Sequence, residues 1–260
     1  MRGIILAGGS ATRLRPLTSV ISKQLLPVYN KPMIYYPLST LMLSGIREFL
    51  LISTKRDVPM FQELLGDGSE LGISIQYLVQ EKPNGIAEAL IIGESFILGE
   101  KVSLILGDNL IYGPGFGRDL LNHVPTEGAT ILAHHVSNPS EFGVVEFNAA
   151  GRAISLEEKP KIPKSNWAIP GLYFYDETAV QRVKGLKPSA RGELEITDLN
   201  RSYLTDRQLN VVKMPRGTAW LDLGTPKALL EAGKFIEILE DRQGLQIGNP
   251  SDVAKLLGWI

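Results

Sequence analysis

The chain has 260 residues, a length that allows one large α/β domain or two small ones. Hydrophobic residues make up 44% of it, as is usual for a globular protein with a sizeable core. Its formal net charge of −1 at pH 7 gives no electrostatic basis for binding nucleic acid or an anionic membrane. The absence of cysteine excludes a disulfide framework, a thiolate metal site and a thiolate nucleophile. The first predicted strand begins almost at Met1, so we expect no signal peptide. No apolar run approaches the roughly 20 residues that span a bilayer, so we expect no membrane segment and a cytoplasmic location.

In the first half of the chain, short apolar runs alternate with segments of helical spacing. We predict strands at 4–7, 49–53, 73–79 and 102–106, and helices at 33–44, 58–65 and 86–96. Continuous Val, Ile and Leu runs are typical of strands buried on both faces, and their alternation with helices favours βαβ units. The pattern therefore predicts an α/β fold whose mostly parallel central sheet is flanked by helices.

From about residue 130, short strands separated by turn residues become more frequent. We predict strands at 130–133, 144–147, 153–156 and 169–175, with a hairpin turn at Gly151, so this half should add antiparallel pairs to a mixed sheet. A helix over 226–242 should gather its apolar residues on one side, namely Leu229, Leu230, Phe235, Ile236 and Leu239. Because no linker-like segment interrupts the chain, we expect a single domain with two functional lobes, about 1–128 and 129–260.

The segment from Gly8 to Arg13 carries the strongest functional signal. It follows the first predicted strand directly and reads Gly-Gly-Ser-Ala-Thr-Arg. Glycines permit a sharp turn and bring backbone N–H groups close to an anion, and Ser10 and Thr12 add hydroxyl donors. The Arg13 guanidinium is a planar, permanently charged group that matches phosphate oxygens. With Lys23 shortly after it, the loop predicts a phosphate site suited to a triphosphate.

Neither of two common phosphate-binding motifs describes this loop. In the dinucleotide fingerprint G-x-G-x-x-G, counted from Gly8, the third and sixth positions are Ser10 and Arg13. In the nucleotide P-loop pattern, counted from Gly3, Gly9 stands where a lysine is required. A nicotinamide-dependent oxidoreductase is therefore disfavoured, and an ordinary strand-to-helix turn is the alternative interpretation of the loop.

Three charged residues follow predicted strands. Asp108 follows 102–106, Lys159 follows the strand that begins near residue 153, and Asp222 follows Ala219-Trp220-Leu221. Ligands of open α/β sheets bind at the carboxyl ends of the strands. Two carboxylates there suit Mg²⁺, which prefers one or two carboxylates together with substrate phosphates. Because Gly-Asp-Asn and Asp-Leu-Gly are also common turn sequences, a structural role is the alternative for each aspartate.

A triphosphate loop, a magnesium site and a further lysine together predict a transfer reaction. A nucleoside triphosphate on the loop would be attacked at its α-phosphorus by a phosphate oxygen of a second substrate, such as a sugar phosphate held by Lys159. Pyrophosphate would leave, and no side-chain nucleophile would be needed. Catalysis would then consist of positioning and charge neutralisation.

Eight segments of the chain resemble those of sugar-phosphate nucleotidylyltransferases. In chain order they are 8–18 (GGSATRLRPLT), 22–27 (SKQLLP), 31–38 (KPMIYYPL), 106–109 (LGDN), 157–160 (EEKP), 171–176 (GLYFYD), 191–198 (RGELEITD) and 220–225 (WLDLGT). Each segment is moderately specific, but the set in this order covers nearly the whole chain. The resemblance implies a Rossmann-like nucleotidyltransferase fold.

The resemblance also implies a role for each matching residue. Those that would bind the nucleotide are Gly8, Gly9, Ser10, Thr12, Arg13, Lys23, Gln80 and Gly85. Arg13 and Lys23 would contact the departing pyrophosphate. Gln80 and the Gly85 backbone would contact the pyrimidine base. Asp108 and Asp222 would bind Mg²⁺. Those that would bind the sugar phosphate are Gly143, Glu158 and Lys159, with Lys159 on its phosphate.

The substrates that the resemblance implies are dTTP and α-D-glucose 1-phosphate, joined to give dTDP-glucose for rhamnose and related deoxysugars. A uridylyltransferase that uses UTP is the alternative within the same class, and a non-catalytic sensor of nucleotide sugars is the alternative outside it. The presence of Arg13, Asp108, Lys159 and Asp222 argues against a sensor, which need not keep a metal pair. A homo-oligomer is also implied.

Three positions depart from the family pattern. Ala11 replaces a usual glycine, which the loop tolerates if the φ angle there is negative. Phe142 replaces a common tyrosine, and Leu223 replaces a usual threonine beside Asp222. Longer family members continue past Ile260 with a helical segment that contributes to subunit contacts and allosteric control, so the size of the oligomer and its regulation are left open.

Overall fold

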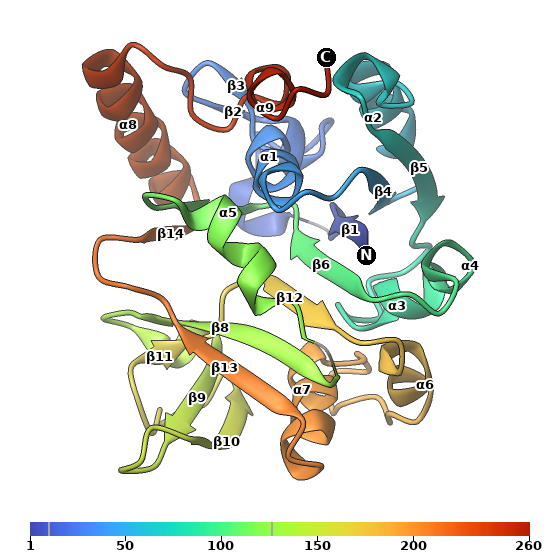
Figure 1. Cartoon of the computed structure of the whole chain (residues 1–260), viewed down its shortest axis with the longest axis vertical. Helices are drawn as coiled ribbons and strands as arrows, with labels where there is room; N and C mark the ends of the chain where they lie inside the picture. The colour runs from blue at the N-terminus through green and yellow to red at the C-terminus, as the bar shows by residue number, and fades with distance from the viewer. Residues whose placement is uncertain (10, 126) are drawn as a thin grey trace. The chain divides into compact units, whose positions relative to one another are not determined.

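The computed structural model describes residues 1–9, 11–125 and 127–260, without the side chains of Arg118, Leu121 and His123 (Figure 1). Ser10, predicted to line the phosphate loop, therefore lies outside the described residues. The chain divides into two compact units, each built from separate stretches of sequence. Unit 1 comprises Met1–Pro83, Ile105–Leu121 and Thr218–Ile260, and unit 2 comprises Asn84–Leu104 and Asn122–Gly217. The functional lobes predicted for 1–128 and 129–260 stay a prediction.

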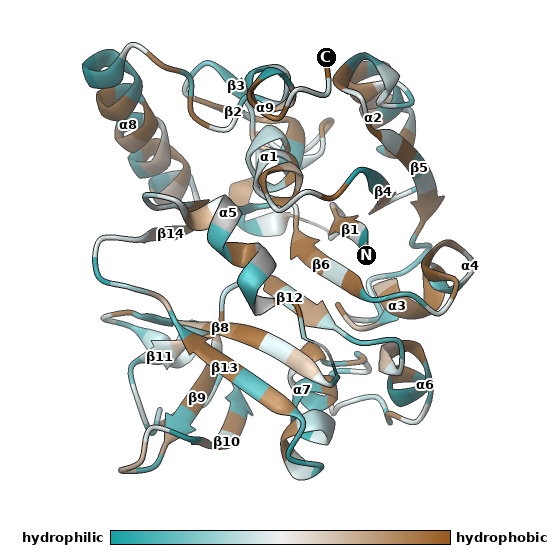
Figure 2. Cartoon of the chain, in the orientation of Figure 1, coloured by the Kyte–Doolittle hydropathy of each residue, from teal (hydrophilic) through white to brown (hydrophobic). Residues whose placement is uncertain are grey.

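Three parallel strands of unit 1 follow the predicted βαβ pattern. β1 (Arg2–Leu6) pairs with β4 (Glu48–Ser53), and β4 pairs with β5 (Ser74–Val79). The intervening helices are α1 (Tyr35–Leu43) and α2 (Val58–Leu65). The apolar residues of β1 and β4 are buried, and Figure 2 shows the hydrophobic colour along β1. Buried parallel strands with helical connections confirm the α/β class.

The other elements of unit 1 are short, apart from one long helix. β7 (Asn109–Tyr112) pairs with β14 (Ala219–Asp222), and β2 (Pro27–Val28) pairs with β3 (Lys31–Pro32), both antiparallel. The helices are η1 (Thr12–Leu14), η2 (Lys23–Leu25), η3 (Ser69–Leu71), α5 (Phe116–Asp119), α8 (Pro226–Gln243) and α9 (Pro250–Leu256). Two elements, β6 (Val102–Leu106) and η4 (Leu120–His123), have residues in both units.

Helix α8 buries a narrower row than the sequence predicts. Its buried residues are Ala232, Ile236 and Glu240, which recur every four positions along the same side of the helix. Leu230 is 61% exposed, so the prediction that it shares the buried side is wrong. Successive helical residues point about 100° apart, which turns Leu230 away from the core that its neighbour Leu229 contacts. That core contains Val28, Met33, Tyr36, Leu110, Leu223, Ala232 and Ile236.

Unit 2 has a mixed sheet. Its strand β8 (Ala129–His135) is parallel to β13 (Leu209–Lys213) and antiparallel to β11 (Trp167–Ala168) and β12 (Leu172–Tyr175). The antiparallel hairpin of β9 (Gly143–Phe147) and β10 (Ala153–Glu158) turns at Gly151, whose φ of 76° favours glycine. The antiparallel pairs predicted for this half of the chain are confirmed.

The helices of unit 2 are shorter than expected. The single helix predicted over 86–96 is wrong, because the chain forms α3 (Glu88–Ile92) and α4 (Glu94–Ile97) with a break at Gly93. Glycine has the lowest helix propensity after proline, and the ψ angle of 5° at Gly93 leaves the α-helical range. The remaining helices are η5 (Pro139–Glu141), α6 (Ala179–Lys184) and α7 (Ile196–Thr205).

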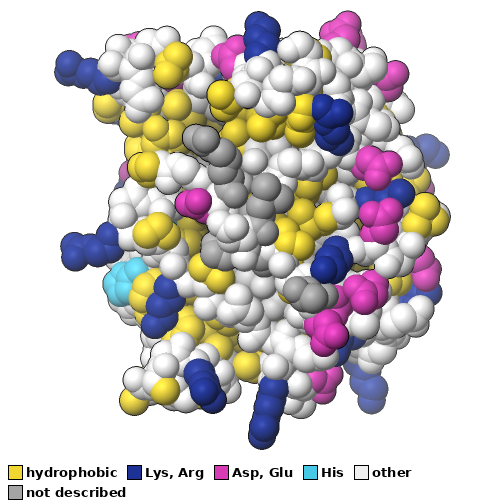
Figure 3. All heavy atoms as spheres, viewed as in Figure 1, with side chains coloured by type: hydrophobic (Ala, Val, Ile, Leu, Met, Phe, Trp, Pro, Cys, Tyr) yellow, Lys and Arg dark blue, Asp and Glu magenta, His cyan; other side chains and the backbone are white. Residues whose placement is uncertain are grey.

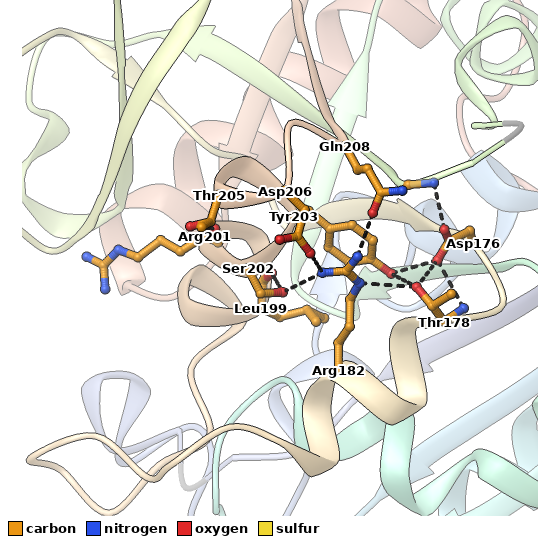
Figure 4. A network of polar contacts seen from close by, with 11 residues as sticks. Asp176, Thr178, Arg182, Leu199, Arg201, Ser202, Tyr203, Thr205, Asp206 and Gln208 are labelled. Carbon is orange, nitrogen blue, oxygen red and sulfur yellow. Dashed lines mark hydrogen bonds and ion pairs between the residues drawn. The ribbon is translucent and has the colours of Figure 1, made fainter.

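A polar network fixes α7 to the rest of unit 2 (Figure 4). The Arg182 guanidinium lies 4.1 Å from the centre of the Tyr203 ring and donates hydrogen bonds to Asp206 (2.7 Å) and Gln208 (2.6 Å). The Tyr203 hydroxyl donates to the buried Asp176 carboxylate at 2.8 Å. Burial alone would raise the pKa of Asp176, but hydrogen bonds from its neighbours lower it, so the network holds a carboxylate. Helix α7 is thereby anchored at its C-terminal half.

Candidate active site

The predicted phosphate loop begins where β1 ends and contains two residues in the left-handed region. Gly9 has a φ of 98° and Ala11 a φ of 46°, with 3₁₀ helix η1 starting at the next residue. The Ala11 carbonyl accepts hydrogen bonds from the Thr18 hydroxyl at 2.8 Å and from the Leu14 backbone N–H at 3.1 Å. The condition of a negative φ, under which the loop would tolerate alanine without strain, is not met at Ala11. These two bonds hold its carbonyl in place, and alanine occupies a conformation that glycine adopts more readily.

The side chain of Arg13, from η1, reaches the end of strand β14. A Cβ atom built on Gly224 would lie 2.4 Å from Nη2 of Arg13 and 3.4 Å from Oδ1 of Asp222. Only a residue without a side chain leaves this space to the guanidinium. The structure thus brings together Arg13 and Asp222, two predicted site residues more than two hundred positions apart in the sequence.

Lys23 and Asp108 form an ion pair in unit 1. Lys23 Nζ donates to Oδ2 of Asp108, and both side chains are mostly buried. Burial would raise the pKa of the Asp108 carboxyl, but the Lys23 charge and hydrogen bonds from Lys23 and Asn109 outweigh it and lower that pKa. Asp108 is therefore a carboxylate at neutral pH and can serve as a cation ligand.

The two predicted magnesium ligands lie at the ends of paired strands. Asp222 is the register partner of Asn109, and the Leu223 N–H donates to the Asp108 carbonyl at 3.1 Å. Among the described residues, no group of three or more His, Asp or Glu side chains forms a metal site. Asp108 and Asp222 would hold Mg²⁺ as a pair, since this ion is usually bound by one or two carboxylates together with substrate phosphates. Each carboxylate oxygen accepts more than one bond, so the Lys23 contact leaves Asp108 free acceptor capacity.

Gln80, the predicted base-binding residue, lies beside the phosphate loop. It follows β5 directly and is buried, with its backbone N–H bonded to the Ser53 carbonyl at 2.8 Å. A Cβ atom on Gly8 would come within 3.1 Å of the Gln80 side-chain oxygen. Gly8, Gln80, Arg13, Lys23, Asp108 and Asp222 all belong to unit 1.

The predicted sugar-binding residues gather at the β9–β10 hairpin of unit 2. Glu158 ends β10 as the register partner of Gly143, the first residue of β9. The hydroxyl of Thr197, which is 2% exposed, donates to Oε2 of Glu158 at 2.6 Å. A Cβ atom on Gly143 would lie 3.4 Å from that same oxygen. The same Cβ atom would lie 3.3 Å from the Thr197 hydroxyl, so Gly143 leaves space beside both the hydroxyl and the carboxylate.

Lys159 and Gly85 both depend on unusual backbone conformations. Lys159 has a φ of 44°, its N–H donates to the Phe142 carbonyl at 3.0 Å, and the residue is exposed. Gly85 has a φ of 109° and packs so tightly that a Cβ atom would lie 2.3 Å from the Leu194 carbonyl oxygen. Both residues belong to unit 2. The roles of Lys159 and Gly85 in binding the substrates remain predictions.

Four residues of the site were not given roles from the sequence. Arg191 bonds both carboxylate oxygens of Glu195 at 2.9 Å and lies 3.8 Å from Glu158. Thr197 contacts the same glutamate, while Asn109 and Trp220 belong to the surroundings of Asp108. All four fall inside segments that carry the family resemblance, and their presence there is the feature of the sequence that could have identified them as site residues.

A separate cavity of about 540 Å³ lies elsewhere in unit 1. Its lining is mostly apolar and includes Tyr36, Leu43, Tyr112 and Val253. None of the predicted site residues lines it. On the face drawn in Figure 3, Lys and Arg side chains occur together with Asp and Glu, as the net charge of −1 suggests.

A glycine-rich loop after the first strand, a lysine–aspartate pair and a second aspartate at a strand end define an α/β protein of the nucleotide-transfer class. The family model described as Nucleotidyl transferase matches residues 2–238, and the chain belongs to this family. The chain is 56% identical to glucose-1-phosphate thymidylyltransferase of Mycobacterium tuberculosis, over 100% of this chain and 90% of that protein. It is 57% identical to the enzyme of the same name from Neisseria meningitidis, over 100% of this chain and 91% of that protein.

Solved structures agree with this assignment. A Bacillus anthracis protein provisionally named glucose-1-phosphate thymidylyltransferase, solved with sucrose, is 41% identical and superposes with a TM-score of 0.83 over 90% of this chain and 94% of that chain. A UDP-glucose pyrophosphorylase solved with UDP-glucose is 21% identical, with a TM-score of 0.79 over 92% of this chain and 98% of that chain, which supports the fold alone. The protein is thus an enzyme, a nucleotidyltransferase.

No helix in the described ranges of the chain has the length and hydropathy that a bilayer crossing requires.

Proposed function

We propose that the protein transfers a thymidylyl group from dTTP to α-D-glucose 1-phosphate, with Mg²⁺ as cofactor, and releases dTDP-glucose and pyrophosphate. The observation that carries this proposal is the cluster of Lys23, Asp108, Arg13 and Asp222 in unit 1. The names of relatives that are 56% and 57% identical support the choice of substrates.

The phosphate loop and its two cations hold the triphosphate. Backbone N–H groups at Gly8 and Gly9 and the Thr12 hydroxyl face the anion, as the chemistry of such loops favours. Arg13 and Lys23 neutralise charge that develops on the departing pyrophosphate. Neutralising the leaving group lowers the barrier to transfer without any change in the covalent chemistry.

Gln80 and the backbone of Gly85 bind the thymine. A side-chain amide offers one donor face and one acceptor oxygen, which match the acceptor and donor of a pyrimidine edge. Gln80 is 7% exposed, so its side chain has limited freedom to accept other hydrogen-bond patterns. This pairing does not by itself separate dTTP from UTP.

Asp108 and Asp222 are the residues that would hold the magnesium ion. When bound there, Mg²⁺ would supply positive charge that offsets the negative charge of the reacting phosphates. The Lys23 ammonium beside Asp108 helps to lower the pKa of that carboxyl and so keeps it ionised.

Lys159, Glu158 and Gly143 hold the sugar phosphate. Lys159 binds the phosphate of glucose 1-phosphate, and the Glu158 carboxylate accepts hydrogen bonds from sugar hydroxyls beside the Gly143 backbone. A phosphate oxygen of glucose 1-phosphate then forms a bond to the α-phosphorus of dTTP. The bond from that phosphorus to the bridging oxygen breaks, and the electron pair leaves with pyrophosphate.

Release of pyrophosphate from four triphosphates against several hexose 1-phosphates tests this function. We expect the highest kcat/KM for dTTP with glucose 1-phosphate. A preference for UTP would instead support the uridylyltransferase alternative. Binding of dTDP-glucose without pyrophosphate release from any pair would support a sensor.

A further inference from the structure

Three hydrogen bonds connect Trp220 to Lys23 through two intervening side chains of unit 1. The Trp220 indole Nε1–H donates to Oδ1 of Asn109 at 2.6 Å. The Asn109 amide Nδ2 donates to Oδ1 of Asp108 at 3.1 Å, and Lys23 Nζ donates to Oδ2 of the same carboxylate. Asp108 is thus held from both of its oxygens.

The strand pairing explains why Trp220 reaches Asn109. In the β7–β14 ladder, Trp220 is opposite Ile111 and Asp222 is opposite Asn109. Opposite residues share a face of the ladder, and so do residues two apart on one strand. Trp220, Asp222 and Asn109 therefore lie on one face, where Trp220 and Asn109 are diagonal neighbours within reach of a long side chain.

The chemistry of the indole fixes the direction of the whole chain of bonds. An indole N–H donates and cannot accept, so the Asn109 oxygen must face it. The Asn109 amino group then necessarily points the other way and presents a donor to Asp108. Asn109 is 3% exposed and Asp108 is 8% exposed, so water does not readily replace these bonds.

We propose that Trp220 is a positioning residue, which acts through Asn109 to orient the Asp108 carboxylate for its cation. This inference rests on the proposed function only in taking Asp108 as a cation ligand. Partners that hold a ligating side chain in place change metal affinity by about 10- to 100-fold when they are removed. Because Trp220 acts one residue further away, we expect the lower end of that range.

Trp220→Phe removes the donor but keeps an aromatic ring on β14. The probe is Mn²⁺, titrated by electron paramagnetic resonance into protein saturated with α,β-methylene dTTP, which does not react. We expect the dissociation constant for Mn²⁺ to rise about tenfold and the apparent KM for Mg²⁺ in the transfer assay to rise in parallel. At saturating Mg²⁺ most of the wild-type kcat should return. The matched control is Trp259→Phe, whose ring lies against the Arg47 guanidinium.

A double variant separates this role from a direct contact between Trp220 and substrate. If Trp220 acts through Asn109, Trp220→Phe adds nothing to Asn109→Ala, and the double variant has the Mn²⁺ affinity of Asn109→Ala alone. Independent, additive effects would overturn the proposal, as would unchanged Mn²⁺ affinity in a folded Trp220→Phe protein. Thermal unfolding of each variant checks the fold. If wild-type protein with the analogue does not bind Mn²⁺, the cation site of the proposed function fails instead.

Discussion

Lys31 and Glu240 form a buried ion pair across 209 positions of sequence, with Nζ and Oε1 2.5 Å apart. The Ile247 N–H donates to the same oxygen at 2.8 Å, and the Asn30 amide donates to Oε2 at 2.8 Å. The pair therefore joins strand β3, the end of helix α8 and the turn that follows it, all within unit 1.

Glu240→Gln should destabilise the protein by about 3 kcal/mol, because it leaves the Lys31 ammonium buried without a counter-ion. Chemical unfolding in urea measures this change. The control is Glu231→Gln on the same helix, where an exposed pair with Lys227 should contribute about 0.5 kcal/mol or less. Equal losses in the two variants would contradict a special role for the buried pair.

The same carboxylate makes stability depend on acid pH. Burial would raise the pKa of Glu240, but hydrogen bonds from Lys31, Ile247 and Asn30 and the Lys31 charge lower it below its usual value. A lowered folded-state pKa contributes stability above the unfolded pKa of about 4.3, and that stability is lost as the pH falls through the folded value. We expect Tm to drop below about pH 4.5 and to drop less steeply in Glu240→Gln.

Gly224→Ala should displace the Arg13 guanidinium while leaving the fold intact. The added methyl would meet Nη2 of Arg13 at 2.4 Å, and the tip of that flexible side chain can move away. Misplacing the guanidinium should lower kcat/KM for the triphosphate by about 10- to 100-fold. Gly233→Ala, within helix α8, is the control, since the added methyl would lie 3.6 Å from the Tyr29 backbone N, an ordinary contact distance. A Gly224→Ala enzyme with normal kinetics would remove Arg13 from the triphosphate site.

Ala11→Gly should stabilise the protein, which is the reverse of most alanine-to-glycine changes. The φ of 46° places Ala11 in the left-handed region. There the Cβ atom costs about 1 kcal/mol, which glycine avoids because it has no Cβ. We expect a gain of about 0.5 kcal/mol in the free energy of unfolding. Ala228→Gly, inside helix α8, should lose about 1 kcal/mol for comparison. A loss at both positions would argue against the left-handed conformation.

Asp108→Asn should reduce turnover by about 10³-fold without unfolding the protein. The amide keeps the size and one acceptor oxygen of the carboxylate but removes the charge that pairs with Lys23. Circular dichroism and pyrophosphate release measure the two properties separately. Asp241→Asn, at an exposed position of helix α8, is the control and should turn over normally. An active Asp108→Asn enzyme would contradict the assignment of Asp108 as a cation ligand.

Much of the local structure was predictable, because it follows from patterns of consecutive residues. The apolar runs predicted for β1, β4 and β6 become strands, and helix α2 has the predicted bounds. The loop from Gly8 to Arg13 follows β1, and Asp108 and Asp222 fall at strand ends. The exposure of Leu230 was missed because it depends on which side of helix α8 finds a packing partner. The break of one predicted helix at Gly93 was missed although it lies at a residue of low helix propensity.

The amino-acid order by itself determined the α/β class and the residue types at the phosphate loop, because hydrophobic periodicity and glycine content act over a few neighbouring positions. Only the tertiary structure decided which of those residues meet. Trp220 and Asn109, 111 positions apart, become neighbours through the β7–β14 ladder. Arg13 and Asp222 both lie beside Gly224, which has no side chain to displace the guanidinium. Such contacts come from strand pairing and close packing between distant segments, which no local pattern of residues encodes.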